Sequence, residues 1–173
     1  DSAMEYFAEY WTNEIKKKNI IHKKLYGKNL IVRPLTISDC SKTYIDWLND
    51  KEVNCYLETR FLKQNRATVE NFVRNMENSN NSILFGIFIK KNKKHIGNIK
   101  IGPINWHHLF ADISYFIGDK NYWSKGLATE AVSLVTKFAF QNLKLNKCTA
   151  GIYSGNTASD RVLKKVGYKQ EGR

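Results

Sequence analysis

The chain has 173 residues, enough for one domain with a sizeable hydrophobic core, and its 42% apolar and 25% charged residues are ordinary for a globular protein. No run approaches the roughly 18 apolar residues that a membrane helix needs, and the three widely spaced cysteines match no metal or disulfide pattern. We therefore expect a cytoplasmic domain with no metal and no membrane partner, whose net charge of +12 favours anionic ligands.

The first half of the chain predicts helices and one short strand. Aromatic and aliphatic side chains recur at helical spacing over residues 5–18, which predicts an N-terminal helix. Leu30-Ile31-Val32 predicts a strand that is stopped by Arg33-Pro34. Ser38 is expected to cap the next helix, and after a less regular stretch residues 68–76 predict another.

The second half predicts most of a sheet. Three consecutive strands are expected, the second of them broken by Gly102-Pro103, over residues 83–90, 95–101 and 108–117. Apolar side chains then repeat near every 3.6 residues over 126–143, which indicates a long helix with one buried face. The pattern ends with a strand over 148–153, a helix over 157–166 and a last strand from Tyr168.

This order of elements indicates one mixed α/β domain built around a mostly antiparallel sheet. The chain contains no Pro-rich linker or internal repeat that would divide it into two domains. The strand before Ile117 is apolar on both sides, so we expect helices to cover both faces of the sheet.

The most informative segment runs from a strand end into the long helix, and reads Trp123-Ser124-Lys125-Gly126-Leu127-Ala128-Thr129-Glu130. The first amides of a helix have no partners inside the helix, and the helix dipole favours negative charge there. Gly126 and Ala128 keep the surface small, and Lys125 adds a positive charge. Together these features are typical of a pyrophosphate cradle, although an ordinary glycine-relieved helix start has the same residues.

This segment resembles the phosphate loop of the GNAT superfamily of acetyl-CoA-dependent N-acetyltransferases, whose pattern is [Q/R]-x-x-G-x-[G/A]. Only the first position, Trp123, departs from the pattern, and an aromatic residue there is similar to the ribosomal-protein N-terminal acetyltransferase subgroup. Asn156-Thr157-Ala158-Ser159 and Gly167-Tyr168 resemble two further elements of the family. The resemblance implies a GNAT domain over residues 25–173, lacking the family's last strand, behind a helical extension over 1–24.

The resemblance also implies where acetyl-CoA binds. The expected contacts are backbone amides near Phe116 and Ile117, the side chain of Asn156, and the whole phosphate loop, which comprises Ser124, Lys125, Gly126, Leu127, Ala128 and Thr129. Asn156 also has the residue type of an ordinary helix cap, and both roles are compatible.

The implied reaction is direct attack of an amine on the thioester, which needs a base and a donor for the departing sulfur. Asp112 stands where the family often has an acid, and His107 and His108 are its rivals. The tyrosine that many members place four residues beyond the Asn motif is Leu163 here, which leaves Ser159 as the expected donor. Structural roles for Asp112 and Ser159 are open alternatives.

We expect the acceptor to be a small-molecule or peptide amine, with a protein N-terminus and an amino sugar on a nucleotide as the two alternatives. Glu58 could attract the amine and Arg60 a phosphate, or the two could form a surface ion pair. The alternative function is a non-catalytic basic module that binds RNA or an acidic partner, but interleaved aromatic–basic RNA motifs are absent, which makes nucleic acid the less favoured partner. The aromatic side chains of the predicted helix over residues 5–18 could pack on a second copy of the chain, so a homodimer is a further alternative.

Overall fold

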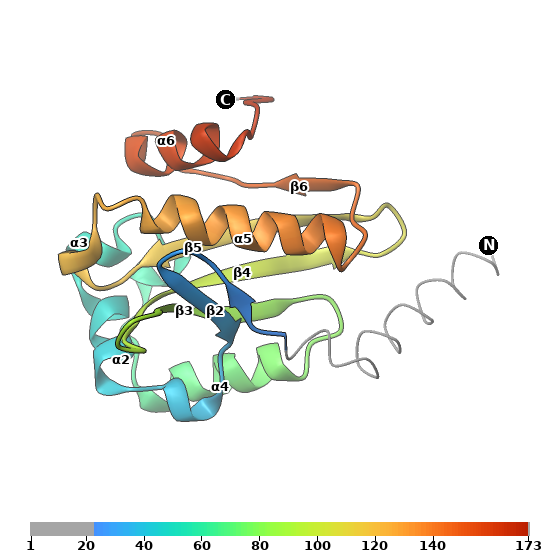
Figure 1. Ribbon diagram of the computed structural model, residues 1–173. Coiled ribbons are helices and arrows are strands. Elements are labelled where there is room, and N and C mark those ends of the chain that lie inside the picture. Colours follow the sequence, from blue (N-terminus) through green and yellow to red (C-terminus); the bar gives the residue numbers. More distant parts are fainter. Residues whose placement is uncertain (1–22, 173) are drawn as a thin grey trace.

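The computed structural model describes residues 23–172 and has a six-stranded sheet at its centre (Figure 1). The strands lie in chain order, and every neighbouring pair is antiparallel except β5 and β6, which are parallel. Their bounds are β1 Leu25–Tyr26, β2 Leu30–Pro34, β3 Ile83–Ile89, β4 His95–Asn105, β5 Phe110–Ile117 and β6 Lys147–Thr149. The prediction of a mixed, mostly antiparallel α/β sheet is confirmed. The predicted helix over 5–18 lies outside the described residues.

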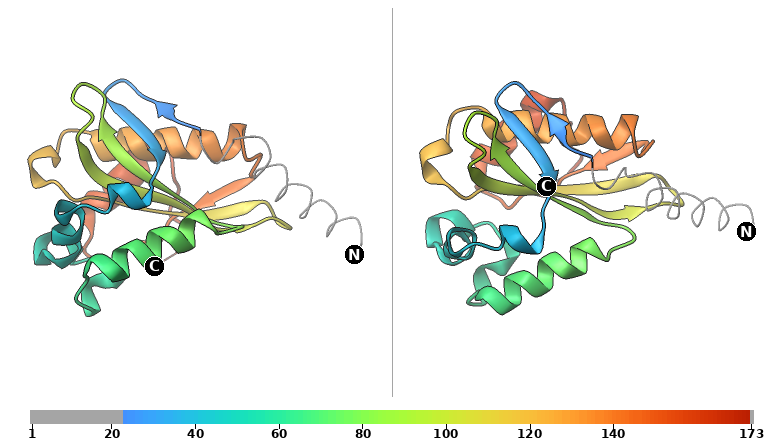
Figure 2. Two further views of the ribbon diagram at one scale, coloured as in Figure 1. Left: turned by 90° about the horizontal axis from the view of Figure 1, so that it is seen from below. Right: turned by 60° about the horizontal axis from the view of Figure 1, so that its bottom comes forward.

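Helices cover both faces of the sheet, as the apolar strands predicted (Figure 2). Among residues 23–172 the α-helices are α2 Lys42–Asn49, α3 Lys51–Asn54, α4 Arg66–Glu77, α5 Leu127–Gln141 and α6 Thr157–Val166. The 3₁₀ turns of the same range are η2 Ile37–Asp39, η3 Glu58–Phe61 and η4 Lys120–Tyr122. None of the helices between residues 23 and 172 is long and apolar enough to cross a bilayer.

The first core lies between the sheet and α5, with α6 beyond it. The apolar face of α5 meets the strand residues that point to the same side, and Phe138 packs edge-on against Phe85 with 5.7 Å between ring centroids. Val135, Phe138 and Ile99 are almost completely buried. Burying side chains of this size contributes roughly 1.5–3 kcal/mol each, so this face fixes α5 on the sheet.

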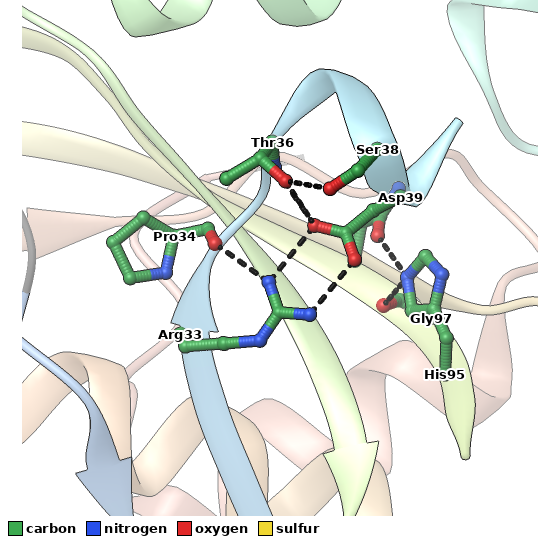
Figure 3. Close-up of polar contacts among 8 residues, drawn as sticks. Arg33, Pro34, Thr36, Ser38, Asp39, His95 and Gly97 are labelled. Carbon is green, nitrogen blue, oxygen red and sulfur yellow. Dashed lines mark hydrogen bonds and ion pairs between the residues drawn. The ribbon is translucent and has the colours of Figure 1, made fainter. Parts of the chain in front are cut away.

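The second core lies on the opposite face, under α2 and α4. The Trp47 ring of α2 packs edge-on against the His95 ring, with 5.1 Å between ring centroids. The His95 ring also stacks on the Phe88 ring, with 4.8 Å between centroids. Beside this cluster the Arg33 guanidinium donates two 2.8 Å hydrogen bonds to the Asp39 carboxylate, which fastens η2 to β2 (Figure 3). Partial burial raises the pKa of Asp39, but the hydrogen bonds from Arg33 and Thr36 together outweigh it and hold the pKa below its usual range.

Two helix and strand boundaries differ from the predicted ones for local reasons. The predicted cap, Ser38, lies inside η2, and Ser41 caps α2 instead by accepting a hydrogen bond from the Tyr44 amide. β4 continues through Gly102-Pro103 to Asn105, because a bulge between Ile101 and Ile104 takes the proline out of the hydrogen-bonded ladder.

The sheet edges also differ from the predictions. β2 runs through Pro34 instead of stopping before it, and β1 is a two-residue strand that the sequence did not indicate. β6 ends at Thr149 rather than at residue 153, and the chain after α6 forms no strand up to residue 172. The early end of β6 has a consequence for function, because it leaves part of β5 without a neighbour.

Candidate active site

The sheet opens between its two parallel strands. β5 pairs with β6 only from Phe110 to Asp112, and its last pair joins Asp112 to Thr149. β5 then continues to Ile117 against β4 alone, while the chain after Thr149 leaves the ladder. The five residue steps from Asp112 to Ile117 span about 17 Å, so among residues 23–172 β5 has no second strand partner along one edge over that length, and we call this unpaired edge the slot.

Backbone amides of β5 point into this slot. The Gly118 amide donates a 2.8 Å hydrogen bond to the Ile96 carbonyl of β4. In a β-strand the amides of successive residues point to opposite sides, so this bond fixes which residues of β5 face β4. Even-numbered residues such as Phe116 therefore turn their amides toward β4. Odd-numbered residues, Tyr115 and Ile117, turn theirs toward the open edge, where an elongated ligand could complete the ladder.

The loop that follows β5 presents a second group of free amides. None of the amides from Ser124 to Thr129 donates a hydrogen bond to another residue in the described part of the chain, and the N-cap of α5 has no side-chain bond. Ser124 and Gly126 have left-handed backbones with φ of 59° and 75°. Backbone of this kind turns successive amides toward one point and forms a concave anion site at the positive end of a helix.

Two residues keep this loop open and in place. A Cβ added at Gly126 would meet no atom within 4 Å, so the space beside its Cα is empty of protein. The indole Nε1 of Trp123 donates to the Ile117 carbonyl at 2.7 Å and ties the loop to the end of β5. This bond explains how an aromatic residue can replace the basic one at the first position of the loop pattern.

Positive charge surrounds the start of α5. A pocket of about 550 Å³ beside the loop is lined by Tyr122, Leu127 and four lysines, Lys28, Lys90, Lys91 and Lys125. None of these lysines forms an ion pair with another described residue. The Lys125 ammonium lies 5.4 Å from the centre of the Tyr122 ring. The combined field of these charges attracts anions to the loop.

Asp112 lies where the slot begins. Its carboxylate accepts a 3.1 Å hydrogen bond from the Thr149 hydroxyl, across the last pair of the parallel ladder. Burial is the largest influence on this side chain and raises the pKa of Asp112 above its usual value. Alternation along β5 puts Asp112 on the face of the second core, opposite Ile113 and Tyr115. His107 and His108 lie exposed in the preceding turn.

The first turn of α6 lies on the other face of the slot. Asn156 caps this helix, and its side-chain oxygen accepts a 3.2 Å bond from the Ser159 amide. The side-chain nitrogen of Asn156 and the Ser159 hydroxyl hydrogen-bond to no other described residue. Leu163 is buried in the first core. The Tyr115 hydroxyl instead reaches the Ser159 carbonyl at 3.4 Å.

Comparisons with known proteins agree with this geometry. The model of the acetyltransferase (GNAT) domain family matches residues 29–169. The chain belongs to the GNAT acetyltransferase family. It is 31% identical over 157 residues to a probable N-acetyltransferase, YjcK, of Bacillus subtilis, covering 86% of this chain and 84% of the relative.

Solved structures share the GNAT fold at low sequence identity. A spermidine N-acetyltransferase from Vibrio cholerae, solved with CoA and spermine, superposes with a TM-score of 0.74 at 20% identity over 84% of each chain. A structure described as a putative ribosomal-protein-serine acetyltransferase, also from Vibrio cholerae, gives a TM-score of 0.72 at 18% identity, covering 87% of this chain and 85% of that one.

GNAT acetyltransferases use acetyl-CoA, and this chain fits that ligand. The free amides and left-handed turn suit a pyrophosphate, the lysines suit its charge, and the slot along β5 suits an extended thioester arm. These features come from separate segments of the chain that only the fold brings together.

In this GNAT domain η3 lies against the segment that follows β6. The Glu58 carboxylate accepts a hydrogen bond from the Tyr153 hydroxyl. The Arg60 guanidinium lies over two rings, 4.6 Å from the centre of Tyr153 and 4.1 Å from that of Phe61, and donates to the Leu57 carbonyl. Glu58 and Arg60 are therefore brought together near the slot, but they do not form an ion pair with each other.

Sequence reasoning missed two residues that the GNAT fold brings to the slot. Tyr115 carries no motif of its own in the sequence, and its place beside the split between β5 and β6 follows only from the pairing of the strands. Tyr153 was assigned to a strand, and nothing in the sequence signals its contact with Glu58, which is 95 residues away.

Proposed function

We propose that this acetyltransferase moves an acetyl group from acetyl-CoA to a primary amine by direct attack in a ternary complex. The observation that carries this proposal is the slot along β5, which begins at Asp112 and ends at a loop of free amides. A thioester laid along the slot would have its phosphates at Gly126 and its reacting carbon near Asp112.

The residues expected to hold acetyl-CoA then have distinct roles. Amides from Ser124 to Thr129 receive the pyrophosphate, and the surrounding lysines add charge. The Asn156 side-chain nitrogen binds the pantetheine arm from α6. Near the reacting carbon an outward amide of β5 receives the acetyl oxygen, and the alternation of the ladder favours Tyr115, the outward residue closer to Asp112, over Phe116. The outward amide of Ile117 lies at the loop end of the slot, beside the pantetheine arm. Bound acetyl-CoA supplies an acetyl group activated as a thioester.

Asp112 is proposed as the base that accepts the proton of the attacking amine. A lysine-like amine is only ~0.04% neutral at pH 7, whereas an α-amine with a pKa near 8 is ~10% neutral, so a base helps both. Burial raises the pKa of Asp112, which makes its carboxylate more basic than an exposed one. Because the aspartate side chain is short, we expect a bridging water between it and the amine.

The acceptor is proposed to be the α-amine of a protein N-terminus. Glu58 and the Tyr153 ring offer a carboxylate and an aromatic face to an ammonium group. Exposed apolar residues beside them, Phe61 and Leu62, suit a peptide side chain better than a sugar. An amino sugar on a nucleotide is the alternative, with Arg60 as its phosphate contact. The net charge of +12 disfavours a polyamine such as the one bound by the Vibrio relative.

The decisive experiment measures acetyl-CoA consumption against a panel of amines. The panel contains peptides with free N-termini, the same peptides with blocked N-termini, amino-sugar nucleotides and polyamines. We expect turnover with free N-termini and none with blocked ones. Turnover with the nucleotides alone would move the acceptor assignment to the amino sugar, and no consumption with any amine would contradict the proposal.

Gly126→Ala tests the phosphate loop directly. The added Cβ meets no protein atom, so the cost to stability is the left-handed backbone alone, about 1–2 kcal/mol. Ligand at 100 times its Kd adds about 2.7 kcal/mol to stability, or roughly 5–10 °C in Tm for a chain of this size. We expect acetyl-CoA to raise the Tm of the wild type by this amount and that of the variant far less.

Gly167→Ala provides the matched control, because Gly167 is another left-handed glycine with no neighbour within 4 Å and lies after α6, away from the loop. Its backbone cost should be similar, and its Tm should still rise with acetyl-CoA. Equal shifts in all three proteins would remove the loop at Gly126 from the binding site.

A further inference from the structure

Tyr115 occupies a distinctive place in the slot. It lies on β5, three residues beyond the last pair with β6, and its half-buried side chain points to the face of the first core. Its hydroxyl crosses the open edge and donates a 3.4 Å hydrogen bond to the backbone carbonyl of Ser159 on α6. A phenol hydroxyl is therefore held between the two elements that bound the slot.

The hydrogen bond to Ser159 is long and weakly held. Distances of 2.5–3.0 Å are usual for a hydroxyl donor, so the bond at 3.4 Å leaves the hydrogen free to turn to a better acceptor in the slot. The Tyr115 ring is anchored independently, because it packs against the first core. A fixed ring with a poorly engaged hydroxyl is the arrangement expected of a donor that awaits a ligand.

The two faces of the slot also differ in chemistry. Asp112 and the Glu58–Tyr153 contact supply carboxylates, and Asp112 lies on the face of the second core. Tyr115 lies on the opposite face, beside α6, where no carboxylate hydrogen-bonds to it. If the amine attacks from the face of Asp112, the sulfur departs from the opposite side of the acetyl carbon. The sulfur would then lie near the hydroxyl of Tyr115.

We infer that the Tyr115 hydroxyl is a catalytic hydrogen-bond donor to the departing sulfur, a role that rests on the proposed function. As the amine nitrogen bonds to the acetyl carbon, the C–S bond breaks and its electron pair goes to sulfur. The amine proton goes to Asp112 and then to solvent. The thiolate is stabilised by the Tyr115 O–H and takes a proton from solvent on release, so atoms and charge balance.

Two further observations support this role. Burial raises the pKa of Tyr115, so the phenol keeps its proton throughout the neutral range and is always available as a donor. Leu163, at the α6 position where many family members have a tyrosine, is buried and cannot donate a hydrogen bond. The hydrogen-bond donor to the sulfur therefore comes from Tyr115 on β5, because α6 has none at the position of Leu163.

The test uses CoA itself, because the donor should stabilise the thiolate of bound CoA whatever the acceptor is. The thiol of bound CoA is titrated by the ultraviolet absorbance of its thiolate, in the wild type and in Tyr115→Phe. We expect its pKa to be about one to two units higher in the variant, because a hydrogen bond to the charged form is lost. With an active acceptor, kcat should fall about 10- to 100-fold with little change in the KM for acetyl-CoA.

Two other variants complete the test. Tyr168→Phe is the matched control, since this half-buried tyrosine packs on the same core and bonds to Thr136 rather than in the slot, and its bound-CoA pKa should equal that of the wild type. Ser159→Ala keeps the backbone carbonyl and removes the rival hydroxyl. If Ser159→Ala raises the thiol pKa and Tyr115→Phe does not, the inference is wrong and the serine is the donor.

The inference and the proposed function fail in different ways. A wild type that does not bind CoA contradicts the proposed function. A wild type that binds CoA and acetylates amines, with Tyr115→Phe unchanged in both thiol pKa and kcat, contradicts the role of Tyr115 and leaves the proposed function intact.

Discussion

At the scale of single residues, Asp112 combines a position at the start of the slot with a carboxyl group that burial makes more basic. The base role predicts that Asp112→Asn removes the rising limb of the pH profile of kcat/KM and lowers the rate by about 10²- to 10⁴-fold. The measurement is the initial rate of acetyl transfer from acid to neutral pH. A limb that persists with the same midpoint would place the base elsewhere.

The raised pKa of Asp112 also allows a test of whether Asp112→Asn loses activity through loss of the base or through loss of stability. A raised pKa means that the folded state favours the protonated carboxyl, so this contribution to stability is present in acid and lost as pH rises through the folded pKa. Asn cannot ionise, so Asp112→Asn should unfold at the same Tm as the wild type or higher at neutral pH. A large fall in Tm there would show that Asp112 is mainly structural.

At the scale of elements, the first turn of α5 both faces the proposed phosphate site and holds the edge of the sheet. The Glu130 carboxylate accepts hydrogen bonds from the Asn29 amide at 2.8 Å, the Asn29 side chain at 2.9 Å and the Leu30 amide at 3.1 Å. One acid thus joins the β1–β2 turn to the helix start, where its charge also complements the helix dipole.

Glu130→Ala is therefore expected to lower the free energy of unfolding by about 1–3 kcal/mol, since three donors lose a charged acceptor and water replaces it only in part. Urea unfolding measures this change. Glu70→Ala is the control, because its ion pair with Arg66 is an exposed one within a single helix and should contribute only about 0.3–0.5 kcal/mol. Equal losses in the two variants would mean that Glu130 does not anchor the turn.

Elements with a long apolar period, such as α5 and β3, could be predicted from the sequence because burial dictates their pattern. Boundaries set by tertiary contacts could not. Pro103 reads as a strand breaker, yet the bulge in β4 accommodates it, and β1 exists only because β2 pairs with it. In the candidate site, the glycine at the start of α5 is a local feature that the sequence predicts, and its phosphate role stays a prediction. The contact of Tyr115 with Ser159 depends instead on how β5 and the chain after β6 separate, which no local pattern encodes.

At the scale of the whole molecule, two cores share one sheet, so a change on either face should affect the unfolding of the entire domain. His95 is the titratable group to test this. Its Nε2 lies 3.0 Å from the Gly97 carbonyl and 2.8 Å from the Asn98 side-chain oxygen, so Nε2 carries the hydrogen and Nδ1 is the site of protonation (Figure 3). Burial lowers the pKa of His95.

A lowered pKa means that, as the pH falls, His95 is protonated in the unfolded chain before it is protonated in the folded chain. The stability contribution is therefore complete above pH 6.5 and is lost as pH falls toward the folded pKa, by up to about 2 kcal/mol between pH 6.5 and 5. His95→Gln keeps a side-chain donor without titrating, so its stability should fall less over this range in urea unfolding. His107→Asn, in an exposed turn, should follow the wild type. If His95→Gln loses as much stability as the wild type, the acid sensitivity arises from other groups.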